Sequence, residues 1–148
     1  MRHVANGLML PAVVVTFGLI ASAAVMVGQG AEVKISKGSV KVPTAGETTT
    51  TAFAVVENPT MYDVYLVSAT ADVAGKAEFR EKISEGAEAQ VKKFVTVPAY
   101  GSVSMDPKSL YLLLTDLKRP LKEADPVSLT LTTDTGAALR VSAVVQKD

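Results

Sequence analysis

The side chains that could act as nucleophiles or bases are scarce in this chain. Among 148 residues there is one histidine, His3, and there is no cysteine. The Ser-His-Asp and Cys-His arrangements both need an imidazole to accept the proton of the nucleophile. His3 lies ahead of a long apolar run, so it cannot serve a site formed by the residues after that run. The sequence therefore predicts that the protein is not a nucleophilic enzyme.

Two pairs of acidic residues are spaced closely enough to be considered for acid–base chemistry. Glu78 lies near Glu81, and Glu123 lies near Asp125. A catalytic pair needs one carboxyl group held in its protonated form by its surroundings. Charged side chains near turns are normally solvated. We interpret both pairs as surface residues and predict neither catalysis nor a cofactor.

The charges of the chain balance, with 15 Lys and Arg residues against 15 Asp and Glu residues. A protein that binds nucleic acid usually has an excess of basic residues gathered on one face. No glycine-rich phosphate loop and no basic stripe interleaved with aromatic residues is present. We therefore expect no nucleic-acid partner and no small-molecule substrate.

Methionine is the remaining soft ligand type. Met61 and Met105 are the two of five methionines that follow the apolar run. Thioether and imidazole groups suit Cu(I), but two isolated methionines cannot make a tight site. Met61 follows the turn signal Asn58-Pro59, and Met105 occupies a strand position. We interpret both as flexible packing or surface residues, and no metal site is predicted from them.

The apolar run extends from Leu8 to Gly28 and contains no charged side chain. As a helix rising about 1.5 Å per residue, it would span about 31 Å, roughly one bilayer core. We predict one N-terminal hydrophobic helix, with residues 1–30 as a retained single-pass anchor and residues 31–148 as a separate domain. Gly18, Ala21 and Ser22 would let another membrane helix approach closely.

The orientation of this segment follows from Arg2, because the short positively charged end stays in the cytoplasm. The predicted location is a bacterial inner membrane, with the domain in the periplasm and the bilayer contacted through residues 8–28. The alternative is a cleaved signal peptide, with cleavage after Ala23 or Gly30, which would leave a soluble periplasmic protein.

After residue 31 the apolar period is close to two, which is typical of strands. Val33 and Ile35 alternate with charged residues, as do Val40 and Val42. Further strands are predicted at residues 51–56, 63–69, 77–80, 91–97, 102–105, 110–114, 127–132 and 139–145. Residues 110–114 are apolar throughout, which favours a central strand covered on both faces. About eight or nine short strands separated by turns predict an all-β antiparallel sandwich or barrel.

Four segments resemble a known family. The run SLYLLLTDLKRPL (residues 109–121) leads through an acidic turn to VSLTLT (127–132). That order is similar to the later half of the periplasmic copper chaperones called PCu(A)C. The segments GSVKVP (38–43), TAFAVVEN (51–58) and DVYLVSA (63–69) resemble its earlier strands. The resemblance implies a cupredoxin-like Greek-key sandwich.

The resemblance also implies where copper ligands would lie. Members of the family bind copper with two His and two Met side chains from separate strands. The matching positions here are Arg80, Val91, Tyr111 and Leu113. None of these side chains offers an imidazole or a thioether. We therefore predict that copper binding has been lost.

Two interpretations of these positions remain open. Arg and Tyr are enriched at the energetic centres of protein interfaces, so a partner surface would comprise Arg80, Tyr111, Leu112 and Leu113. In the other interpretation Tyr111 only caps the core, while Arg80 pairs with one of its acidic neighbours, Glu78, Glu81 or Asp116.

The favoured function is a non-catalytic, membrane-tethered accessory subunit or assembly factor. Its partners would be subunits of a larger membrane complex, such as an electron-transfer chain or a copper enzyme. The alternative is a secreted periplasmic copper chaperone that delivers Cu(I) to an oxidase through ligands not matched above. An affinity for Cu(I) would separate the two hypotheses.

Overall fold

The computed structural model describes residues 32–147, which contain ten strands and no helix. The strands are β1 (Lys34–Lys41), β2 (Thr50–Asn58), β3 (Val64–Ala71), β4 (Ala74–Glu81), β5 (Gln90–Lys92), β6 (Val95–Val97), β7 (Gly101–Ser104), β8 (Leu110–Leu117), β9 (Pro126–Thr133) and β10 (Ala138–Gln146).

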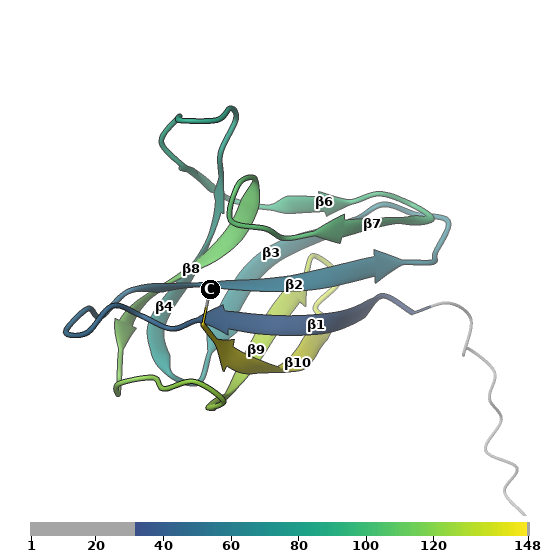
Figure 1. Cartoon of the computed structure of the whole chain (residues 1–148). Coiled ribbons are helices and arrows are strands. Elements are labelled where there is room, and N and C mark those ends of the chain that lie inside the picture. The colour runs from purple at the N-terminus through teal and green to yellow at the C-terminus, as the bar shows by residue number, and fades with distance from the viewer. Residues whose placement is uncertain (1–31, 148) are drawn as a thin grey trace, which may run out of the picture.

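All ten strands belong to one sheet, which curls until its halves face each other (Figure 1). The order is β5-β4-β8-β2-β1-β10-β9-β3-β6, and β7 pairs with the end of β2. Because β3 leads directly into β4, the sheet nearly closes on itself. The fold is thus all-β and two-layered, as predicted.

A period of two places alternate side chains inside this sheet. Buried residues from β2, β8 and β9 form much of one core, namely Ala52, Ala54, Val56, Leu110, Leu112, Leu114, Val127, Leu129 and Leu131. Each fully buried Leu or Val contributes roughly 1.5–3 kcal/mol of transfer free energy. The hydrophobic effect on alternate residues therefore determines which face of every strand points outward.

Two details differ from the sequence expectation. The predicted strand at residues 91–97 is divided at Lys93, because β5 pairs with β4 whereas β6 pairs with β3. This division accounts for ten strands rather than eight or nine. The pairing of β1 with β10 is parallel, so the sheet is not antiparallel throughout.

The expectation that residues 110–114 are covered on both faces was wrong. Strand β8 is central, between β4 and β2, but only its inner side chains are fully shielded. Tyr111 and Leu113 are half-buried on the outer side. Their apolar character therefore reflects a partly exposed outer surface rather than a second core.

Within residues 32–147 the structure contains no helix that is suited to cross a bilayer. The predicted N-terminal helix, with Gly18, Ala21 and Ser22, lies outside the described residues. The proposed boundary between residues 30 and 31 lies there too.

Candidate functional site

Three of the four positions matched to copper ligands lie side by side in the sheet. Arg80 on β4 pairs with Val91 on β5 and with Tyr111 on β8. Leu113 follows on the same face of β8, opposite Glu78 of β4. Directly paired residues have Cβ atoms about 4.5–5.5 Å apart. We call the surface formed by Glu78, Arg80, Val91, Tyr111 and Leu113 the outer β4 face.

An ion pair holds Arg80 on this surface. Its Nε and Nη2 atoms donate hydrogen bonds to Oε2 of Glu78, at 3.1 and 2.8 Å. Lys76 Nζ pairs with the other carboxylate oxygen of Glu78. The hydrogen bonds from Lys76 and Arg80 lower the pKa of Glu78 below its ordinary value. Of the three carboxylates considered for Arg80, Glu78 is therefore its partner.

Apolar groups lie beside this ion pair. Val91 is 56% exposed, and Tyr111 and Leu113 are half-buried. At the edge, Lys92 Nζ lies 2.9 Å from Oε2 of Glu81. Apolar and aromatic side chains thus flank the Glu78–Arg80 ion pair on both sides, and protein–protein interfaces also combine aromatic residues with arginine. The arrangement can make contacts but presents no acid–base pair, because Glu78 and Glu81 are each bound to cations.

Leu112 does not belong to this surface. The sequence analysis included it among the partner-binding residues, but its side chain is 0% exposed. Side chains alternate along β8, so Leu112 points into the core between Tyr111 and Leu113. The prediction for Leu112 was wrong, and its role is packing.

The donor groups of the outer β4 face do not fit Cu(I). Guanidinium, isopropyl, phenol and isobutyl groups replace the soft ligands that Cu(I) prefers. Met61 lies in the β2–β3 turn and Met105 is buried just after β7, so neither lies on this face. In the part of the chain that the structure describes, no three His, Cys, Asp or Glu residues gather into a potential metal site.

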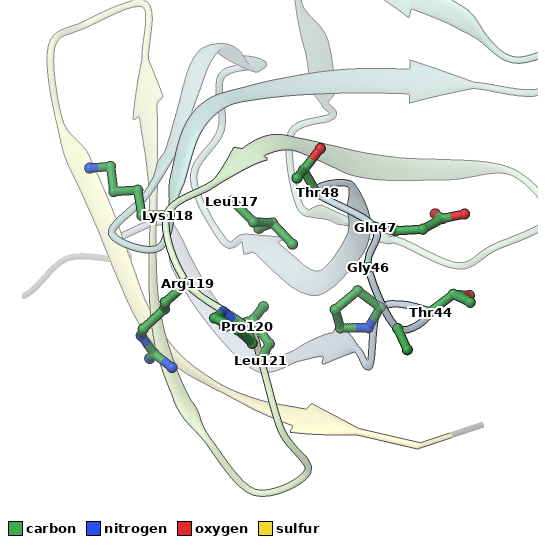
Figure 2. A pocket seen from close by; sticks show the side chains of 11 residues that line it. Thr44, Gly46, Glu47, Thr48, Leu117, Lys118, Arg119, Pro120 and Leu121 are labelled. Carbon is green, nitrogen blue, oxygen red and sulfur yellow. The ribbon is translucent and has the colours of Figure 1, made fainter.

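A separate cleft of about 300 Å³ lies between the β1–β2 loop and residues 117–121. In Figure 2, Leu117, Pro120 and Leu121 lie opposite Gly46 and Glu47, and the Arg119 side chain points away from that loop. Glu47 is the one carboxylate among the residues that line it. Among the described residues that line the cleft, Glu47 therefore has no second carboxylate and no histidine with which to form the acid–base pair that catalysis needs.

Next to this cleft, Arg119 Nη1 lies 3.2 Å from Oδ2 of Asp125. The backbone N–H of Lys122 and the Arg119 side chain lower the pKa of Asp125. Asp125 is therefore a structural anion, which agrees with the surface interpretation of the acidic residues near residue 123.

Sequence analysis missed one exposed feature. Met61, Tyr62 and Tyr100 are strongly exposed in two turns at one end of the sheet. The signal was present, because Met61 and Tyr62 lie two and three residues after Pro59, and Tyr100 lies two residues after Pro98. Turns at the surface normally favour small or polar residues.

The comparisons with known proteins agree with this architecture. The model of the family described as "Putative lipoprotein LpqE-like" matches residues 33–145. A relative from Leifsonia xyli subsp. xyli (strain CTCB07), named "Putative lipoprotein Lxx21020", is 30% identical over 117 residues, which cover 77% of this chain and 69% of the relative.

Solved structures show the same fold. The copper-bound PCuAC domain from PmoF2 superposes with a TM-score of 0.68 at 17% identity, over 78% of this chain and 93% of that domain. The Cu(I) form of DR1885 from Deinococcus radiodurans has a TM-score of 0.66 at 26% identity, over 85% and 86% of the two chains. The predicted resemblance to PCu(A)C copper chaperones is confirmed. This chain therefore belongs to the LpqE-like family, and residues 33–145 form a PCu(A)C-like domain.

Proposed function

We propose that this protein is a non-catalytic accessory subunit or assembly factor that acts by contact and does not carry copper. The supporting observation is the register of the outer β4 face. Three of the four positions matched to copper ligands are paired across neighbouring strands and the fourth lies two residues along β8, yet their side chains are Arg80, Val91, Tyr111 and Leu113. The positions that would surround the ion thus lie close together, but their side chains are of the kinds that make protein–protein contacts.

A tether to the membrane is part of this proposal. The names of the family and of the relative include the word lipoprotein. None of these 148 residues is a cysteine, so a lipid attached through a cysteine sulfur has no attachment point among them. The uncharged run from Leu8 to Gly28 is long enough to take over that role.

The loss of copper is tested by titrating the full-length protein with Cu(I) against a competing chelator. Because the matched positions lack soft donors, we expect no binding tighter than about micromolar. Tighter binding would refute the central claim.

The contact role is tested by purifying the protein from native membranes in mild detergent with any bound partner. Val91→Glu places a carboxylate on the β5 side of the outer β4 face, next to Arg80, where Val91 is 56% exposed. Val67→Glu makes the same change on β3, where Val67 is 44% exposed. We expect the first variant to lose its partner and the second to keep it. A wild-type protein that migrates alone would contradict the proposal.

The second candidate function is a secreted chaperone that carries Cu(I). It is favoured by the Cu(I) form of DR1885, which shares 26% identity with this chain. The Cu(I) titration decides between the two functions, since only the chaperone requires tight binding.

A further inference from the structure

Three large apolar side chains project from one end of the sheet. Met61 and Tyr62 lie in the β2–β3 loop and are 63% and 72% exposed, and Tyr100 lies in the β6–β7 turn and is 73% exposed. We call these three residues the aromatic end. Large apolar side chains exposed together usually mark a binding surface rather than a contribution to the fold.

The two loops of the aromatic end are fixed to each other. The backbone N–H of Tyr100 donates to the carbonyl of Thr60 at 3.0 Å, and that of Ala99 donates to Oδ1 of Asp63 at 2.9 Å. The buried Asn58 side chain donates to the carbonyls of Tyr62 and Val97, at 2.8 and 3.0 Å. The exposed side chains are therefore presented from an ordered base.

Tyr100 has an unfavourable backbone for its residue type. The N–H of Gly101 donates to the carbonyl of Pro98 at 2.9 Å, which closes a turn in which Tyr100 has a φ of 56°. Glycine is preferred at such a position because a Cβ is strained there. An exposed tyrosine at a strained position indicates that its side chain has a role outside the fold.

The chain enters the domain at this same end. Lys34 of β1 pairs with Glu57 of β2, one residue before Asn58. Figure 1 shows the start of β1, the end of β2 and the β6–β7 turn at the same end of the sheet. Lys34 lies six positions after Gly28, and an extended chain over six positions reaches at most about 20 Å. An anchor formed by residues 8–28 would therefore hold the aromatic end close to the bilayer.

The charge of the aromatic end suits a neutral lipid surface. In residues 58–63 and 98–101 the one charged side chain is Asp63, whose carboxylate accepts the Ala99 hydrogen bond. The neighbouring Glu57 lies opposite Lys34 in the β1–β2 register, so the formal charges of these two residues cancel. Tyrosine is favoured where lipid headgroups meet acyl chains, because its ring is apolar and its hydroxyl is polar. We propose that Met61, Tyr62 and Tyr100 rest in the headgroup region of a zwitterionic bilayer. This inference relies on the tether of the proposed function.

The absence of tryptophan from the chain provides a direct test. Full-length protein with Tyr62→Trp or Tyr100→Trp is reconstituted into phosphatidylcholine vesicles, with or without bromine on the acyl chains. Bromine quenches tryptophan only at close range, so we expect emission to fall about twofold at both positions. Ala45→Trp, in the β1–β2 loop at the other end of β2, should show no quenching.

Phe17→Trp reports on the tether separately, because residue 17 lies within the apolar run. Quenching at residue 17 without quenching at residues 62 and 100 overturns this inference and leaves the tether intact. Quenching at residues 62 and 100 alone supports the lipid contact and refutes the tether, and no quenching anywhere refutes both. If the tryptophans at residues 62 and 100 are shielded from solvent in native membranes but not in the lipid vesicles, a protein covers the aromatic end, and the inference is overturned.

A second variant separates lipid contact from folding. Tyr100→Gly removes the ring and suits the φ of 56°, so the domain should remain folded. In this background the quenching of Tyr62→Trp should weaken, because half of the aromatic contact is gone. Unchanged quenching would show that Tyr100 does not contribute.

Discussion

At the scale of single residues, Asn58 determines how one end of the domain is built. It is 1% exposed, and its Oδ1 accepts hydrogen bonds from the N–H and the hydroxyl of Thr60, at 3.0 and 2.6 Å. Together with its two donated bonds, this arrangement satisfies the whole amide. Because Thr60 and Tyr62 follow Asn58 by two and four residues, these bonds also fix the turn that begins at Asn58-Pro59.

Asn58→Ala should therefore be clearly destabilising. It leaves the carbonyl of Val97 and the N–H of Thr60 without their partner, and each buried polar group left in this state costs about 1–3 kcal/mol. The measurement is the free energy of unfolding in urea. Ser102→Ala, an exposed polar position on nearby β7, should change it by less than about 0.5 kcal/mol. Equal effects would contradict this account of Asn58.

Glu78 makes the outer β4 face sensitive to acid. Its folded pKa lies below the ordinary value of 4.5 because Lys76 and Arg80 donate hydrogen bonds to its anion. The stabilisation is therefore fully present above pH 4.5 and is lost as the pH falls through the lowered folded pKa. Wild type should exceed Glu78→Gln in unfolding free energy by at most about 1 kcal/mol at neutral pH. The urea midpoints of wild type and Glu78→Gln should converge as the pH is lowered from neutral to acidic. A difference between the two proteins that does not change with pH would be evidence against the ion pair.

At the scale of elements, consecutive leucines on β8 face opposite sides of the sheet, with Leu112 in the core and Leu113 on the outer surface. Leu112→Ala should reduce the unfolding free energy by about 2–5 kcal/mol, because a fully buried side chain leaves a cavity. Leu113→Ala removes a half-buried side chain from the outer face and should cost less than about 1.5 kcal/mol. Urea unfolding of both variants tests this difference, and the reverse order would mean that the register of β8 is wrong.

The pairing of β5, β4 and β8 predicts that copper binding can be installed. The variant carries Arg80→His, Val91→Met, Tyr111→His and Leu113→Met, at positions already adjacent in the sheet. We expect its Cu(I) affinity to exceed that of the parent by about a hundredfold or more, because two imidazoles and two thioethers converge. Chelator competition provides the measurement. A control with only the two histidines should bind more weakly, and a quadruple variant no better than the parent would show that the face lacks the required geometry.

At the scale of the whole molecule, most strands were predictable because burial on one face imposes a period of two. The division of residues 91–97 into two strands was not predictable, because the apolar pattern runs through this segment without a break. Its first half pairs with β4 and its second half with β3. Pairing partners are set by long-range topology, which local periodicity does not report. The adjacency of Arg80 and Tyr111 was inferred from the family resemblance, whereas the assignment of Leu112 failed because the alternation along β8 was not applied.

The mass of the protein in membranes tests the whole-chain proposal. With its anchor retained, the protein should have a mass near 15.5 kDa, as the full chain does. Removal of about 30 residues would leave roughly 12–13 kDa. Mass spectrometry of the membrane fraction distinguishes the two. The smaller mass would mean that the apolar run is a leader, and the tether would then be abandoned.

The pairing of β1 with β10 links the first strand of the domain to the last. A growing polypeptide therefore cannot complete this sheet until Gln146 has left the ribosome, however early Lys34 emerges. Until then β1 has one unsatisfied edge, and such edges recruit other extended chains. The sheet of residues 34–146 can therefore close only after its last strand is available, so the fold is completed late however readily its first strands pair.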